Sequence, residues 1–260
     1  MTRSTLLKMT FHSKTLKTVT DVNIICPVEY IDGKDVGIVR KNREYKVLWL
    51  FHGGTDDYSA WINRTMLLSY AEEYPELLIV MPTIYDFHSM LKKENYWMYA
   101  IEELPEMVQS TFPVSEKRQD NYIAGLSMGG YFAYRIAMTY PSRYACVGSF
   151  ASPLDIEEDM RARHMEATNY PSPEEVSHNP DRDLFAMIND NMNRKAEMPQ
   201  MFQACGMQDM TYNLNQNMRA YLEQKNIKHT YLEWPGSHNW TFWNTAIDKF
   251  LRWLPLKEEE

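Results

Sequence analysis

A serine flanked by glycines lies at the junction between an apolar run and a helical pattern. Residues 125–129 read Gly-Leu-Ser-Met-Gly, which matches G-x-S-x-G with Ser127 at the centre. The run before it, 121–126, is short and apolar like a buried strand, and the pattern after it, 131–140, is helical and stops at Pro141. A strand, a tight turn and a helix in this order predict a strained turn that lifts the Ser127 hydroxyl above the edge of a sheet. Such a hydroxyl is a candidate nucleophile.

Short apolar runs alternate with helical patterns along the rest of the chain. The predicted strands cover residues 5–11, 18–26, 46–51, 77–81, 121–126, 145–150, 200–205 and 229–234. The predicted helices cover residues 60–73, 99–112 with a break near Pro105, 131–140, 215–225 and 240–254. This alternation predicts an α/β fold with a mostly parallel, doubly wound sheet, and the first two strands are expected to form an antiparallel N-terminal edge.

Residues 154–198 differ in character from the rest of the chain, because they are polar and rich in Met, Asn and Glu. We expect helices and loops there, inserted between two strands of the sheet. The 260 residues, of which 44% are hydrophobic and 24% charged, are typical of a globular protein. This length fits one large α/β domain that spans residues 1–260.

A serine hydroxyl is a weak nucleophile unless a base takes its proton and a carboxylate orients that base. In sheets of this kind ligands bind at the carboxyl ends of the strands, so residues that directly follow strands are the candidates. His238, in the loop between the last strand and the last helix, is the predicted base. Asp209, which follows the strand 200–205, is the predicted acid. The alternative interpretation of His238 is a surface histidine, and that of Asp209 is a turn aspartate that bonds its own backbone. The other candidates for the base are His164, His178 and His229, and those for the acid are Asp183 and Glu233.

Two backbone N–H groups are needed for the oxyanion that forms on the substrate. One is predicted to be that of Met128, directly after the nucleophile, and the other that of Gly54, with Gly53 as the alternative. The His52 side chain is expected to support this loop rather than to react. Four aromatic residues are predicted to wall a substrate pocket, namely Trp61, Tyr96, Trp97 and Trp240. Ordinary packing is an equally good interpretation of each.

Composition excludes several other classes of function. A net charge of −8 without a basic stripe argues against nucleic-acid binding. No apolar run is long enough to span a membrane, and with no secretion signal visible the expected location is the cytoplasm. The three cysteines lie in apolar runs, where buried free thiols are expected, and no Cys or His spacing is typical of a metal site.

With these residues assigned, the chain resembles the esterase D branch of the α/β-hydrolases, and within it the bacterial tributyrin esterase group. The matching segments span nearly the whole chain in order; they are residues 11–16, 51–55, 101–105, 124–131, 203–206 with Asp209, and 237–240. The resemblance implies a serine carboxylesterase that needs no cofactor and acts on short acyl chains. It also implies a possible homo-oligomer, and no segment of that family matches the insertion 154–198.

We therefore expect a serine carboxylesterase for acetyl-like esters, whose substrates are small molecules or acetylated or feruloylated plant oligosaccharides. The first alternative is an S-formylglutathione hydrolase or other thioesterase with the same residues, although a net charge of −8 disfavours an anionic thiol leaving group. The second is a non-catalytic binding protein that keeps the fold. Loss of a catalytic residue would indicate it, whereas Ser127, Asp209 and His238 are all present.

Overall fold

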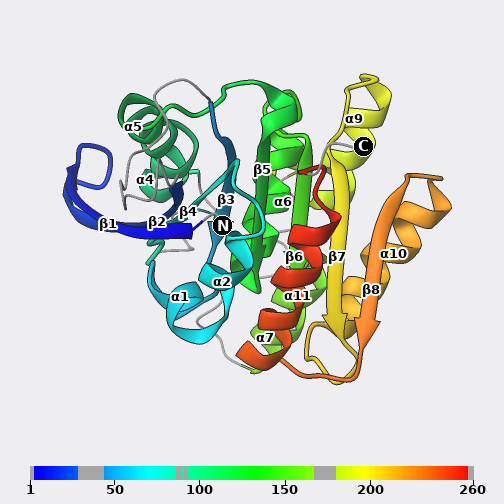
Figure 1. The fold of residues 1–260 in the computed structure, drawn as a ribbon. Coiled ribbons are helices and arrows are strands. Elements are labelled where there is room, and N and C mark those ends of the chain that lie inside the picture. Colours follow the sequence, from blue (N-terminus) through cyan, green and yellow to red (C-terminus); the bar gives the residue numbers. More distant parts are fainter. Residues whose placement is uncertain (1–2, 29–43, 86–89, 91–92, 167–179, 257–260) are drawn as a thin grey trace.

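The computed structural model describes residues 3–28, 44–85, 90, 93–166 and 180–256 (Figure 1). In this part of the chain the backbone forms an eight-stranded sheet with the order β1-β2-β4-β3-β5-β6-β7-β8. The strands are β1 (Arg3–Ser13), β2 (Thr18–Val28), β3 (Lys46–Phe51), β4 (Leu77–Pro82), β5 (Asn121–Leu126), β6 (Cys146–Phe150), β7 (Gln200–Gly206) and β8 (His229–Trp234).

The sheet has an antiparallel edge and a parallel body, which confirms the predicted arrangement. β1 pairs antiparallel with β2, and β2 pairs antiparallel with β4, whereas every pairing from β4 through β8 is parallel. The residues of β4 and β5 are all buried, as expected for strands covered on both faces. Because β3 to β8 run in the same direction, the loops that follow them meet at one edge of the sheet.

Helices cover both faces of the sheet. One apolar layer contains residues of α1 (Ala60–Arg64), α2 (Leu67–Ala71) and α11 (Trp240–Trp253), and α11 lies over the strands in Figure 1. The layer on the opposite face draws on α4 (Asn95–Met98), the π-helix η1 (Tyr99–Glu103), α5 (Leu104–Thr111), α6 (Met128–Thr139), α7 (Ile156–Glu166), α9 (Leu184–Asn193) and α10 (Tyr212–Gln224). A short 3₁₀ turn, η2 (Arg118–Asp120), precedes β5.

The expected insertion contains α7 and α9, and its residues 167–179 lie outside the described part. The backbone just before α9 is tied to α6. Arg135, which is almost fully buried, donates from Nε to the carbonyl of Asp181 at 2.7 Å, and the Tyr131 hydroxyl donates to the carbonyl of Arg182 at 2.7 Å. Arg135 also donates to the carbonyl of Met90 at 2.8 Å. One buried cation therefore joins the insertion and the segment after β4 to the helix that follows Ser127.

Two predicted helices differ from the observed ones. The predicted helix 60–73 is divided into α1 and α2, because the residue after α1, Thr65, is extended. The predicted helix 99–112 begins earlier, at Asn95, and continues past Pro105 instead of breaking there.

Candidate active site

Ser127 occupies the turn between β5 and α6 and has a strained backbone. Its φ of 51° and ψ of −128° lie in a region that residues with a side chain rarely adopt. The surroundings hold this conformation, since the Ser127 N–H donates to the carbonyl of Phe150 at 3.0 Å. Gly129 allows a close approach on the other side, because a Cβ there would lie 2.1 Å from the carbonyl oxygen of His52. The Ser127 hydroxyl does not cap α6, so it is left available to a side-chain partner.

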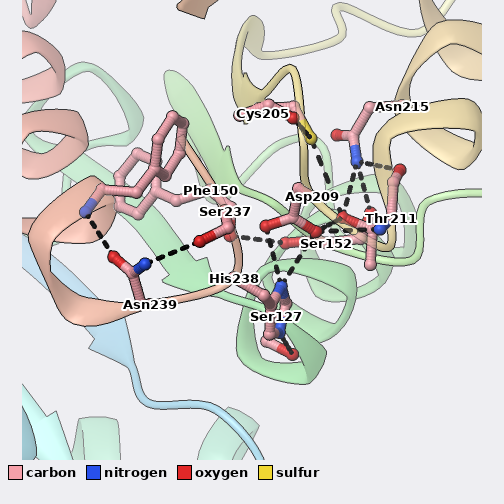
Figure 2. Close-up of polar contacts among 12 residues, drawn as sticks. Ser127, Phe150, Ser152, Cys205, Asp209, Thr211, Asn215, Ser237, His238 and Asn239 are labelled. Atoms are coloured by element: carbon pink, nitrogen blue, oxygen red, sulfur yellow. Dashed lines mark hydrogen bonds and ion pairs between the residues drawn. The ribbon is translucent and has the colours of Figure 1, made fainter. Parts of the chain in front are cut away.

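That partner is His238, which lies between Ser127 and Asp209 (Figure 2). His238 Nε2 is 3.0 Å from Ser127 Oγ, and Nδ1 is 3.0 Å from each carboxylate oxygen of Asp209. A carboxylate only accepts, so Nδ1 carries the proton and Nε2 is free to accept the proton of the hydroxyl. The ring of Trp243 meets the imidazole edge to face, with centroids 4.9 Å apart. This geometry can transfer a proton from Ser127 to His238.

Asp209 follows β7 and is held by a network that sequence reasoning missed. Its side chain is fully buried, and its Oδ1 accepts from both the N–H and the hydroxyl of Thr211, each at 2.8 Å. Asn215 in α10 in turn donates to the carbonyl of Thr211 at 2.9 Å. Asp209 thus bonds the backbone of its own turn and also contacts His238. The two interpretations of this residue, a turn aspartate and an acid that orients the base, are both observed. A threonine two residues after an aspartate was the available signal.

The alternative candidates are used elsewhere or lie outside the described part. The side chain of Asp183 caps α9 by accepting from the N–H of Phe185, and Glu233 accepts from Tyr212 and Gln216. His229 opens β8, and its Nδ1 contacts the carbonyl of Ile227. His178 and the side chain of His164 lie outside the described residues.

The loop after β3 lies against Ser127. A Cβ on Gly53 would be 3.3 Å from the Cβ of Ser127 and 2.5 Å from Cδ1 of Leu126, so a side chain there would displace the end of Leu126 and crowd Ser127. Gly54 is exposed, and a Cβ there would meet no described atom within 4 Å. Met128 begins α6 on the other side of Ser127. Met128 therefore follows the serine directly in the chain, and the loop that carries Gly54 reaches the serine through Gly53.

The aromatic residues predicted to wall a pocket have different environments. Trp61 is fully buried, donates to the carbonyl of Phe51 at 3.1 Å and meets Trp240 edge to face at 5.4 Å. Trp240 is half-buried at the start of α11. Trp97 is buried on the α6 side of the sheet, where the guanidinium of Arg135 lies 4.6 Å from its ring centre. Packing accounts for Trp97 and Trp61, and Trp240 alone of the three offers exposed surface.

Tyr96 is partly buried against the same core layer as Trp97 and meets the ring of Tyr99 edge to face at 6.3 Å. Packing therefore also accounts for Tyr96.

A cleft of about 300 Å³ begins one residue beyond Gly54. Its lining is polar and comprises Thr55, Asp56, Asp57, Ser59, Ala60, Asn63, Arg64, Ile84 and Tyr85. Burial raises the pKa of Asp56, and the nearby Arg64 opposes that shift. The cleft therefore presents carboxylates beside the predicted oxyanion donor. The sequence did not lead us to predict a cleft formed by these residues.

The described residues contain no group of three or more His, Cys, Asp or Glu side chains arranged to hold a metal ion. Within the same ranges no helix has the length and apolar character needed to cross a bilayer. The three cysteines are free and buried, as expected.

Comparison with known proteins decides the family. The sequence-family model named Esterase matches residues 13–254. The chain belongs to this family. The assignment confirms the predicted esterase D-like relationship, and the protein is a carboxylic ester hydrolase. It is 26% identical over 261 residues to the acetyl esterase of Caldicellulosiruptor saccharolyticus, an alignment that covers 96% of this chain and 97% of that protein.

Other similarities concern a short segment and the fold. A stretch of 55 residues is 49% identical to part of the S-formylglutathione hydrolase of Paracoccus denitrificans. This stretch covers 21% of this chain and 19% of that protein. The fluorophosphonate-binding serine hydrolase F of Staphylococcus aureus superposes with a TM-score of 0.80 at 24% identity, covering 98% of this chain and 100% of that one. The esterase therefore has the α/β-hydrolase fold, as predicted.

Proposed function

We propose that the esterase hydrolyses short-chain, acetyl-like acyl esters through an acyl-enzyme on Ser127. The observation that carries the proposal is the position of His238, with one ring nitrogen 3.0 Å from the Ser127 hydroxyl and the other 3.0 Å from both oxygens of Asp209. Similarity to an acetyl esterase along nearly the full length of both chains supports the acyl preference.

In the first half of the reaction Ser127 Oγ attacks the ester carbonyl carbon while His238 Nε2 takes the hydroxyl proton. The N–H groups of Gly54 and Met128 donate to the oxygen that becomes negative. Asp209 keeps the imidazole oriented and stabilises its positive charge. The tetrahedral intermediate then collapses, His238 gives the proton to the leaving alkoxide, and the alcohol departs.

In the second half a water molecule replaces the alcohol. His238 takes a proton from the water as its oxygen attacks the acyl carbon, and the same N–H groups hold the oxyanion. Collapse breaks the bond to Ser127 Oγ, which recovers its proton from His238, and the carboxylic acid leaves. Every proton taken is thus returned, so no cofactor is required.

The test is hydrolysis of p-nitrophenyl acetate by a Ser127→Ala variant. We expect kcat to fall by about 10⁶-fold, the loss seen when a serine hydrolase loses its nucleophile. Full activity in this variant would refute the proposal. An acyl series from acetate to octanoate, run beside acetylated and feruloylated xylan, then identifies the preferred acyl group and alcohol.

A second candidate is hydrolysis of S-formylglutathione, favoured by the segment that is 49% identical to such an enzyme. The same residues would act on the thioester carbonyl. The cleft beside Gly54 argues against it, because it carries Asp56 and Asp57 against the single cation Arg64 and so repels an anionic leaving group. We expect kcat/KM to be higher for neutral acetate esters than for S-formylglutathione; the opposite ranking would favour the thioesterase.

A further inference from the structure

The buried ring of His52 has a backbone contact at each nitrogen. The N–H of Ile84 points at Nε2 at 2.9 Å, and Nδ1 lies 2.6 Å from the carbonyl oxygen of Gly53. A backbone N–H can only donate, so Nε2 must accept, and in a neutral imidazole the other nitrogen then carries the hydrogen. Burial lowers the pKa of His52, which favours this neutral form. His52 Nδ1–H therefore donates to Gly53.

This hydrogen bond orients the carbonyl of Gly53 and, with it, the N–H of Gly54. The C=O of Gly53 and the N–H of Gly54 belong to one planar trans peptide unit, so they point in opposite directions. Holding the carbonyl toward the His52 ring directs the Gly54 N–H away from it. Gly54 directly follows Gly53, which lies against Ser127, and a Cβ built on Gly54 would meet no described atom within 4 Å.

His52 is itself held from two directions. Its Nε2 links the loop after β3 to Ile84, which follows β4, and its carbonyl oxygen lies against Gly129 in the first turn of α6. The N–H of Met128 belongs to the same turn. His52 therefore contacts both the loop that carries Gly54 and the turn that carries Met128. Its ring cannot rotate without losing both of its backbone contacts.

We propose that His52 is a positioning residue that aims the Gly54 N–H at the oxyanion. The proposal rests on the proposed function, because it requires Gly54 to be a donor in ester hydrolysis. His52 touches no reacting atom and exchanges no proton during the reaction. Its contribution is to pre-orient a dipole, so it acts on the transition state and leaves substrate binding unchanged.

Two substitutions separate orientation from simple packing. Asn places an amide N–H near the position of Nδ1, whereas Leu fills a similar volume without a donor. For His52→Leu we expect kcat for p-nitrophenyl acetate to fall by up to about 10²–10³-fold, the cost of losing one oxyanion donor, with KM little changed. His52→Asn should retain most of the wild-type kcat. Equal losses in both variants, each shown to be folded by its thermal transition, would overturn the proposal.

A second readout is taken on the wild-type protein and does not depend on any variant being active. Long-range ¹H–¹⁵N correlation spectra report which imidazole nitrogen carries the hydrogen, and the spectrum of His52→Asn assigns the His52 signals. We expect the Nδ1–H tautomer at neutral pH. An Nε2–H tautomer or an imidazolium would overturn the proposal. Full activity of Ser127→Ala would instead refute the proposed function, so the two failures are distinguishable.

Discussion

Thr211 donates two hydrogen bonds to one carboxylate oxygen of Asp209, from its backbone N–H and from its hydroxyl, each 2.8 Å long. Because the Asp209 side chain is fully buried, these bonds take the place of water and leave the carboxylate facing His238. The role of Asp209 thus depends on Thr211, a residue that takes no part in the reaction itself.

Removing the Thr211 hydroxyl should therefore impair the reaction. A hydrogen bond to a charged group is worth about 1.5–3 kcal/mol, so we expect Thr211→Val to lower kcat/KM by about tenfold or more. Thr211→Ser keeps the hydroxyl and should stay near the wild-type value. Steady-state hydrolysis of p-nitrophenyl acetate measures both, and equal losses in the two variants would show that keeping the hydroxyl does not preserve activity.

Asp209→Asn replaces a group that only accepts with one that can also donate. An amide N–H facing Nδ1 would favour the tautomer in which Nε2 carries the hydrogen and cannot accept from Ser127. We expect kcat to fall by up to about 10⁴-fold, or about 5 kcal/mol in the barrier. Asp183→Asn makes the same chemical change at the cap of α9, where Asn also serves, and should leave kcat unchanged.

Gly54 offers a direct test of its backbone donor. Its φ is not in the left-handed region and a Cβ meets no described atom within 4 Å, so Gly54→Ala should fold and keep the N–H. Gly54→Pro removes that N–H, and it also fixes φ at about −65° and restricts Gly53 before it. We expect the Ala variant to hydrolyse p-nitrophenyl acetate nearly as well as wild type and the Pro variant to lose about 10²–10³-fold in kcat. A Pro variant as active as the Ala variant would exclude Gly54 as a donor.

The cysteines should be unreactive in the folded protein. Burial raises the pKa of Cys26 to about 11 and the pKa values of Cys146 and Cys205 to about 12, so all three remain protonated at pH 8. We expect 5,5′-dithiobis(2-nitrobenzoate) to leave native activity intact, and to titrate three thiols only after unfolding. Rapid inactivation of the native esterase at pH 8 would show that one of these thiols is accessible.

The sequence was sufficient for features that depend on local patterns. Short apolar runs predicted the strands of the described sheet to within a few residues. The glycine pattern around Ser127 predicted the strained turn, because a strand and a helix meet there at close range. His238 and Asp209 followed from their position after strands, since parallel strands bring such loops to one edge.

Long-range contacts explain where local patterns failed. Pro105 lacks the N–H that would bond the carbonyl of Ile101, but it stands in the first turn of α5, directly after the π-helix η1, where proline is tolerated. Arg143 donates to the carbonyl of Ile101 at 2.9 Å in its place. The interruption between α1 and α2 is similar. The N–H of Met66 donates to Oδ1 of Asn244 in α11 at 2.8 Å, and this satisfies a group that a continuous helix would have used. Residues so distant in sequence leave no local signal.

The nucleophile itself is tested most directly by labelling with a fluorophosphonate, followed by peptide mass spectrometry. In the folded wild-type esterase we predict one adduct, on the peptide that contains Ser127, because His238 Nε2 lies 3.0 Å from its hydroxyl. Ser127→Ala should not be labelled, and His238→Ala should be labelled much more slowly. An adduct on another residue, or none in folded protein that hydrolyses p-nitrophenyl acetate, would contradict the assignment of Ser127 as the nucleophile.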